Sequence, residues 1–182
     1  FDIYPDILRN TPVWPSIGNH EIDELVEPRP DYFAYLSIFS PPEAAQAGGA
    51  ASGSKRYYSF DHGDVHFICL DSMTSDRSAD SPMFRWLKAD LESTAARWLI
   101  AFGHHPPYSK GSHDSDNAIE DQELTDMRQR ALPLLEAHGV DLVLSGHSHS
   151  YERSLLINGH YGLSPTLSPS MIRNSGTGRP NE

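Results

Sequence analysis

Residues 140–153, which read V-D-L-V-L-S-G-H-S-H-S-Y-E-R, decide how the rest of the chain is interpreted. The apolar run from Val140 to Leu144 is typical of a short strand that is buried on both faces of a parallel or mixed sheet. His147 and His149 follow directly, and side chains two residues apart in an extended segment point the same way. The stretch therefore predicts two imidazoles beyond the carboxyl end of a strand, either as metal ligands or as ordinary loop histidines.

The composition limits the classes of partner. The chain has 182 residues, which indicates one domain with a sizeable core. Its formal net charge is -11, from 14 Lys and Arg against 25 Asp and Glu, so the surface repels nucleic acid and anionic membranes. No apolar run approaches the roughly 20 residues of a membrane span. The single cysteine, Cys69, lies in an apolar run, and we expect a buried thiol rather than a reactive one.

The rest of the chain alternates strand patterns with helix patterns, which predicts an α/β fold. The sequence D-H-G-D between two β-rich runs predicts a hairpin, and the hairpin makes the sheet mixed. Pro133 falls inside a helical stripe, where we expect a kink or a restart of the helix. The predicted elements are strands at 57–60, 65–70 and 97–102 and helices at 81–91 and 124–138.

The amino-terminal third of the chain is less regular. Two prolines precede Ile17, where a short strand is expected to end. Residues 28–56 are rich in proline and glycine, and we expect an irregular surface loop with a flexible tip at residues 48–54.

Three predicted strand ends each place a histidine within two residues of a glycine. The three sequences are Gly18-Asn19-His20, Gly103-His104 and Gly146-His147. Because ligands of α/β sheets bind beyond the carboxyl ends of strands, we expect the three loops to converge. The other histidines, His62, His66, His138 and His160, are expected to lie elsewhere in structural or solvent-exposed roles.

These motifs resemble a known family. G-N-H-E at 18–21, G-H-H-P-P-Y at 103–108 and G-H-S-H-S-Y-E-R at 146–153 are similar to the last three motifs of the calcineurin-like metallophosphoesterases. The Y-E-R extension and the later His113 look most like the purple acid phosphatase branch. The resemblance implies an αββα sandwich with mixed sheets and metal-dependent hydrolysis of phosphate monoesters or diesters at a dinuclear site.

The resemblance also implies a role for particular residues. Asn19, His104 and His147 would hold one metal ion, and His149 would be a ligand of the other. Iron, zinc or manganese would suit this set of oxygen and nitrogen donors. His20 and His113 would act on the phosphate or the leaving group, whereas His105 occupies a variable position of the motif and receives no role.

The chain departs from the family pattern before Gly18. The family's first two motifs, which supply the bridging aspartate and most ligands of the first metal, do not occur there. Residues 1–182 are therefore expected to be a partial catalytic domain, incomplete at the amino-terminal end and at the carboxyl-terminal end, that holds just over half of the site and is inactive alone.

Two functions remain open from the sequence. The first is a phosphoesterase that acts on small phosphate esters, with a secreted or periplasmic location suggested by the resemblance alone. The alternative is a catalytically inactive, phosphoesterase-like domain with a binding or structural role. The metal content of the purified protein distinguishes the two, because only the enzyme needs bound transition metal.

Overall fold

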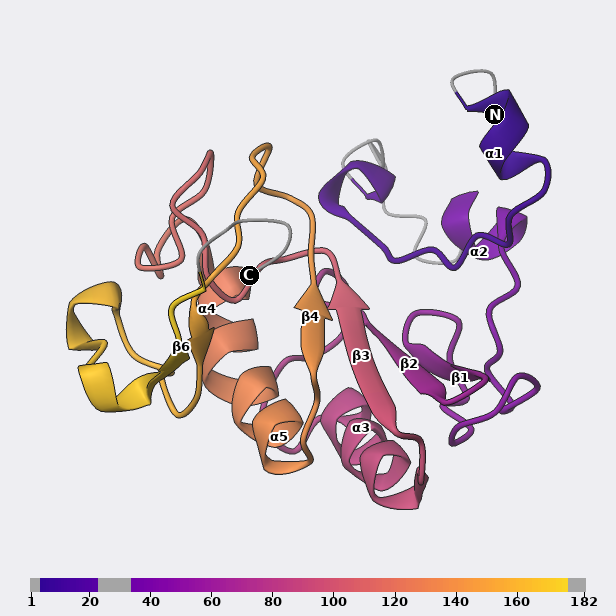
Figure 1. Ribbon diagram of the computed structural model, residues 1–182. Coiled ribbons are helices and arrows are strands. Elements are labelled where there is room, and N and C mark those ends of the chain that lie inside the picture. The colour runs from indigo at the N-terminus through magenta and orange to yellow at the C-terminus, as the bar shows by residue number, and fades with distance from the viewer. Residues whose placement is uncertain (1–3, 23–33, 177–182) are drawn as a thin grey trace.

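The centre of the molecule is a four-stranded mixed sheet, seen in the computed structural model, which describes residues 4–22 and 34–176. The strand order is β1-β2-β3-β4 (Figure 1), with β1 antiparallel to β2, and β3 parallel to both β2 and β4. The predicted mixed α/β class is confirmed. The strands are β1 Tyr58–His62, β2 Val65–Leu70, β3 Trp98–Gly103 and β4 Leu142–Leu144.

The predicted hairpin joins β1 to β2. His62 pairs with Val65, so the connecting turn is the two residues Gly63 and Asp64. Gly63 has a φ of +58°, a backbone conformation that glycine adopts without steric cost. The tight turn fixes the register, which places alternate residues of both strands on opposite faces of the sheet.

Helix α3, Pro82–Ser93, covers one face of the sheet. It begins as predicted, with Pro82 in its first turn and the Ser81 hydroxyl accepting a hydrogen bond from the Phe84 N–H at 3.3 Å. Its apolar stripe includes Met83 and Leu87, which are 1% and 0% exposed. These side chains form the main core together with the inward residues of β2 and β3, namely Ile68, Leu70, Leu99 and Ala101.

A second helical stretch packs into the same core and changes its winding on the way. It consists of α4 Gln122–Asp126, the π-helical turn η2 Met127–Ala131 and α5 Leu132–Ala137. Pro133 has no N–H, and its ring would clash with the carbonyl of Gln129 in a regular α-helix. The wider π turn directly before the proline relieves that clash, so the predicted interruption takes the form of a π turn within a continuous helix.

The segment before Gly18 is extended but does not pair as a strand, so the expected strand ending at Ile17 is wrong. Pro12 and Pro15 cannot donate ladder hydrogen bonds, which explains the absence of pairing. The Pro15 carbonyl instead accepts hydrogen bonds from Tyr35 at 2.9 Å and from Tyr58 at 2.8 Å. These bonds tie the segment to helix α2, Ala34–Ile38, and to β1.

The loop that was expected to have a flexible tip is instead anchored. Part of residues 28–56 lies outside the described residues, but the tip at 48–54 is described. The Ala50 N–H donates to the Asp90 carboxylate at 2.6 Å, and its carbonyl accepts from the Trp86 indole at 2.9 Å. Both partners belong to α3, so the tip is part of the packed structure.

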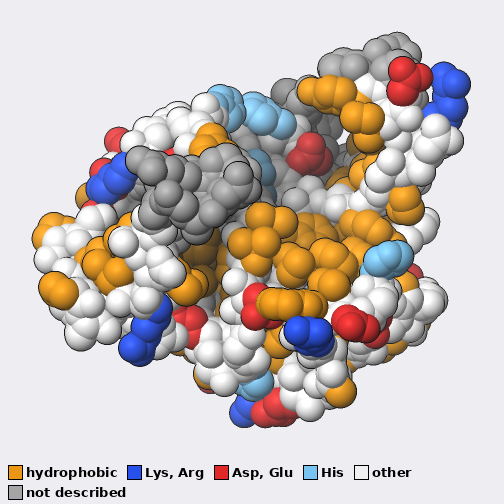
Figure 2. Space-filling view, viewed as in Figure 1, with side chains coloured by type: hydrophobic (Ala, Val, Ile, Leu, Met, Phe, Trp, Pro, Cys, Tyr) orange, Lys and Arg blue, Asp and Glu red, His pale blue; other side chains and the backbone are white. Residues whose placement is uncertain are grey.

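The opposite face of the sheet is open along β4, whereas Tyr58, Phe60 and Cys69 on β1 and β2 form a buried cluster. Figure 2 shows hydrophobic side chains gathered over the strands on this face. The expectation that the strand before Gly146 is buried on both faces is wrong, because Leu142 and Leu144 are 47% and 50% exposed. β4 lies at the edge of the sheet with β3 as its one neighbour there, and none of the described helices covers its outer face.

The remaining elements are short. Strands β5 and β6 form a separate antiparallel pair (Figure 1), and no helix in residues 4–22 and 34–176 is long and apolar enough to cross a membrane. These elements are α1 Pro5–Leu8, the 3-10 turns η1 Asn19–Glu21, η3 Ser164–Thr166 and η4 Pro169–Met171, and strands β5 Leu156–Ile157 and β6 Ile172–Asn174.

Candidate metal centre

The candidate site lies beyond the carboxyl ends of β3 and β4, where histidine side chains gather in Figure 2. The two strands are parallel, so both deliver their following loops to the same edge of the sheet. The Gly146 N–H donates to the His104 carbonyl at 2.9 Å, which joins the two loops directly. The predicted convergence of these loops is present in the structure.

Two potential donor atoms lie close to the ring of His104. His104 Nε2 lies 2.8 Å from Asn19 Oδ1 and 3.0 Å from His147 Nδ1. One ring nitrogen carries either a single proton or a single lone pair, so it cannot form two well-directed hydrogen bonds with both neighbours. Donors bound to one metal ion at about 2.0–2.2 Å lie roughly 2.8–3.6 Å from one another, from octahedral to tetrahedral geometry. The donor set therefore fits a shared metal ion better than it fits a hydrogen-bond network.

Asn19 is positioned by the short turn in which it lies. The Glu21 carboxylate accepts a hydrogen bond from the Gly18 N–H at 2.6 Å, which closes η1 around Asn19. A Cβ atom at Gly18 would come within 2.7 Å of His104 Nδ1. Glycine at this position therefore lets the turn approach the His104 ring closely enough for the Asn19 oxygen to reach Nε2.

His147 has an unusual backbone. Its φ is +62°, and the Ser148 N–H donates to the Gly146 carbonyl at 2.7 Å across it. This three-residue turn with a positive central φ is rare and strained. The sharp exit from β4 thus occurs at His147 itself.

The turn also changes the argument about His149. Because His147 is not extended, alternation of side chains along a strand does not place His149 beside it, and that reasoning was wrong. His149 is exposed, and its backbone N–H donates to the Ser112 hydroxyl at 3.0 Å. Among the described residues, the groups of close potential ligands do not include His149. Its role as a ligand of a second metal ion stays a prediction.

His105 lies beside the candidate ligands, although sequence reasoning gave it no role. It is 4% exposed, and its ring lies 4.4 Å from that of His147, between centroids. Ser72 Oγ, just past the end of β2, hydrogen-bonds its Nδ1 at 2.8 Å. His104, His105 and His147 form one group of potential ligands. The doubled histidine in G-H-H-P-P-Y was the available signal, but a motif position that varies in the family receives no role from the resemblance.

The electrostatics keep these histidines neutral. Burial is the main cause that lowers the pKa of His104, and burial with the adjacent His147 lowers that of His105 to about 3. Burial together with His113 and His104 lowers the pKa of His147 to about 4. Neutral imidazoles with free lone pairs are the form that binds metal ions.

His113 lies beside this group. Its ring stacks on that of His147, with centroids 3.8 Å apart and planes 27° apart, and its Nδ1 is 2.8 Å from Asp121 Oδ1. His113, Asp121 and His147 form a second group of potential ligands. In this group the His113 Nδ1 already lies at hydrogen-bond distance from the Asp121 carboxylate. We therefore interpret His113 and Asp121 as a hydrogen-bonded pair next to the candidate ligand His147.

The remaining histidines are His20, which was expected at the site, and four that were expected outside it. His20 is exposed on η1, one residue after Asn19, and its predicted catalytic role stays a prediction. The four histidines that were expected outside the site belong to neither group of potential ligands. His62 is exposed at the end of β1, His66 is buried between Asp61 and Asp90, His138 bonds the Leu134 carbonyl, and His160 bonds the Leu163 carbonyl.

Known proteins with similar sequences share a common name. Purple acid phosphatase 15 of Arabidopsis thaliana is 34% identical over 153 residues, which cover 82% of this chain and 26% of that protein. A protein named probable inactive purple acid phosphatase 9, also of Arabidopsis thaliana, is 30% identical and covers 84% of the chain and 26% of its own length. The chain thus spans about a quarter of these relatives.

A solved structure gives a weaker likeness. It is a purple acid phosphatase isolated from yellow lupin (Lupinus luteus) seeds, with a TM-score of 0.42 and 23% identity, covering 57% of this chain and 18% of that one.

The family model described as calcineurin-like phosphoesterase matches residues 2–151, which include each strand end of the candidate site. The chain therefore belongs to the calcineurin-like phosphoesterase family.

Proposed function

We propose that this protein hydrolyses phosphate esters at a dinuclear metal site, as a phosphomonoesterase or a phosphodiesterase. The observation that carries the proposal is that Asn19 Oδ1 and His147 Nδ1 lie 2.8 Å and 3.0 Å from the same nitrogen, His104 Nε2. An amide oxygen and two neutral imidazoles suit iron, zinc or manganese. The net charge of -11 adds a reason for bound cations, because the surface as a whole repels a phosphate ester.

The chain's own residues would orient the ester and assist the leaving group. When bound, the metal ions would supply a water of lowered pKa and would stabilise charge on the phosphoryl oxygens. His113 stacks on His147 and so lies next to the proposed ligands, where it would hydrogen-bond the phosphate or donate a proton to the departing oxygen. His20 follows Asn19 directly and would hydrogen-bond the same phosphate, or help to protonate the leaving group, from the turn η1.

The second metal ion needs donors beyond those that the described residues bring together. His149 is its one predicted ligand in this chain, whereas a catalytic metal generally has about three protein ligands and a water. We therefore propose that catalysis requires ligands in addition to Asn19, His104, His147 and His149. The substrates are proposed to be small phosphate esters, and the secreted or periplasmic location stays a prediction.

Metal binding and hydrolysis test the proposal together. The full-length protein and its His104→Ala variant are purified without chelators, and their transition-metal content and hydrolysis of an aryl phosphate are measured. The matched control is His62→Ala, which removes an exposed histidine at the end of β1. We expect the His104→Ala variant to lose metal and activity and the His62→Ala variant to keep both.

The competing function is a catalytically inactive binding or structural domain, and the name of one relative keeps it in view. Less than one equivalent of transition metal in the unmutated protein, or equal metal content in the two variants, would favour the inactive domain. Bound metal without hydrolysis of monoesters or diesters would leave the metal site standing and overturn the proposed activity.

A further inference from the structure

We propose that Asp121 is a positioning residue that fixes the ring orientation and the tautomer of His113. The importance of this role for turnover rests on the proposed function, whereas the effect on the His113 ring does not. The proposal concerns which nitrogen of His113 is presented to the site.

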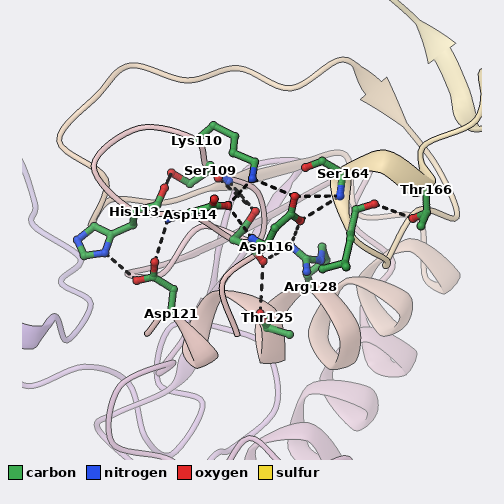
Figure 3. A network of polar contacts seen from close by, with 12 residues as sticks. Ser109, Lys110, His113, Asp114, Asp116, Asp121, Thr125, Arg128, Ser164 and Thr166 are labelled. Carbon is green, nitrogen blue, oxygen red and sulfur yellow. Dashed lines mark hydrogen bonds and ion pairs between the residues drawn. The ribbon is translucent and has the colours of Figure 1, made fainter. Parts of the chain in front are cut away.

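Both carboxylate oxygens of Asp121 are used in the contact with the loop that carries His113 (Figure 3). Oδ1 lies 2.8 Å from His113 Nδ1, and Oδ2 accepts the Asp114 N–H at 2.9 Å. An ionised carboxylate can only accept hydrogen bonds, so the proton of a neutral His113 ring must be on Nδ1. Nε2 is then the nitrogen left for a partner in the site.

Asp121 is ionised although it is buried. Its side chain is 10% exposed. Burial acts to raise the pKa of Asp121, but the hydrogen bonds from the Asp114 N–H and the His113 ring outweigh this, and the pKa lies below its usual value. The carboxylate therefore acts as an acceptor over the working pH range of most enzymes.

The use of Asp121 is also unusual for its place in the sequence. It directly precedes α4, where an aspartate ordinarily caps the helix by accepting an N–H from the first turn. Here its side chain makes no capping hydrogen bond. The carboxylate is turned away from its own helix towards the loop at residues 113–114, so helix stability does not explain its position.

His147 makes the second contact that holds the His113 ring. The His113 ring stacks on the His147 ring at 3.8 Å, so the plane of His113 is held on one side by a proposed metal ligand and at one edge by Asp121. Half a rotation of the ring would exchange its nitrogen and carbon positions and break the bond to Asp121. The pair of contacts thus selects one of two ring orientations.

The loop itself has other anchors, which makes the proposal separable from loop stability. Asp116 accepts the Ser164 N–H at 3.0 Å and lies 2.9 Å from Lys110 Nζ. Figure 3 shows this network on the opposite side of the loop from His113. Glu152 accepts hydrogen bonds from the Ser109 hydroxyl and the Lys110 N–H, each at 2.8 Å.

The decisive variant is Asp121→Asn in the full-length protein. An amide has one acceptor and one donor group, so it cannot accept from both His113 Nδ1 and the Asp114 N–H. If it keeps the backbone bond, its NH2 group faces His113 Nδ1, which must then be the unprotonated nitrogen. We expect the proton of the neutral ring to move from Nδ1 to Nε2, as measured by the ¹⁵N chemical shifts of the His113 imidazole.

Kinetics give the second measurement. We expect kcat on an alkyl phosphate to fall at least about tenfold in Asp121→Asn, with a much smaller change in KM, since a positioned proton donor contributes on the order of 10²–10⁴. A doubly protonated His113 ring that gives its Nε2 proton to the leaving group is left as the Nδ1–H tautomer, and the Asp121 carboxylate stabilises both of these forms through Nδ1. Asp121→Glu should retain the Nδ1 tautomer and recover part of the loss. The matched control is Asp116→Asn, which removes a carboxylate from the same loop without touching His113 and should leave the tautomer and kcat unchanged.

The outcomes separate the two proposals. An unchanged His113 tautomer in Asp121→Asn, or an equal effect of Asp116→Asn, would overturn the positioning role. If the unmutated protein hydrolyses no phosphate ester, the proposed function fails, and the imidazole spectra still decide whether Asp121 sets the His113 ring.

Discussion

Gly18→Ala tests whether the geometry around His104 is that of a metal ligand. Gly18 has a φ of -115° and a ψ of 179°, an extended conformation that alanine adopts without strain. The added Cβ would lie 2.7 Å from His104 Nδ1, whereas ordinary van der Waals contacts begin near 3.4 Å. The ring must therefore move by roughly 0.7 Å, which exceeds the tolerance of about 0.2 Å for a metal–ligand distance.

We expect a large effect on metal binding and a small one on stability. The affinity for zinc or manganese should fall about 10- to 100-fold, as for other changes that displace a ligand. The free energy of unfolding should change by about 1–2 kcal/mol or less, because two effects oppose each other. Overpacking destabilises the folded state, whereas alanine lowers the backbone entropy of the unfolded chain and so favours folding. Isothermal titration calorimetry and thermal unfolding of the metal-free protein measure the two quantities.

Gly146→Ala provides the control at the same ring. A Cβ at Gly146 would lie 3.8 Å from His104 Nδ1, which is an ordinary contact, and its φ lies outside the left-handed region. Metal affinity should therefore change little in this variant. Equal affinities in Gly18→Ala and Gly146→Ala would refute the reasoning, because the displaced ring would then have no part in binding the ion.

Three further predictions follow from the structure. Asp90→Ala should lower the free energy of unfolding by about 3–5 kcal/mol in urea titrations, because Asp90 is buried and lies 2.8 Å from His66. Burial lowers the pKa of His66, but the bonds to Asp90 and Asp61 outweigh it and raise the pKa above 6.5. The stabilisation that the protonated His66 ring gains from these two carboxylates should be complete below pH 6.5 and lost as the pH rises through the raised value. Ser81→Ala should cost about 1 kcal/mol in thermal unfolding through loss of the α3 cap, and a cost near zero would contradict the capping bond to Phe84. His113→Ala should lower turnover more on alkyl than on activated aryl phosphates, because a proton donor matters most for a basic leaving group; an equal loss on both would indicate a binding role alone.

The regular parts of the fold were predictable because each has a local signal. The hairpin at Gly63, the cap at Ser81 and the interruption at Pro133 depend on residues within a few positions of the feature. The exposure of Leu142 was not predictable in this way. An apolar run shows that a strand can be buried, but whether a neighbour covers it depends on segments far away in the sequence.

Some features of the candidate site were also predictable from the sequence, and others were not. The convergence of His104 and His147 follows from histidines beyond the carboxyl ends of two parallel strands, β3 and β4, whereas Asn19 reaches them from a segment that is not a strand. The positions of His105 and Asp121 depend on contacts with Ser72 and with the loop at 113–114, which no spacing in the sequence reveals. The turn at His147 was missed because nothing in the residue type signals a positive φ there.

The turn at His147 has a consequence for the order in which the molecule forms. Its geometry depends on the Gly146 N–H bond to the His104 carbonyl, which exists only after β3 and β4 have come into register. A residue that is unfavourable by itself in this conformation cannot nucleate structure, so the loop should close late in folding and open first in native-state hydrogen exchange. A ligand that binds His104 and His147 together would then slow the exchange of the Gly146 and Ser148 amides, which makes these two amides reporters of occupancy in a protein whose global stability hardly changes.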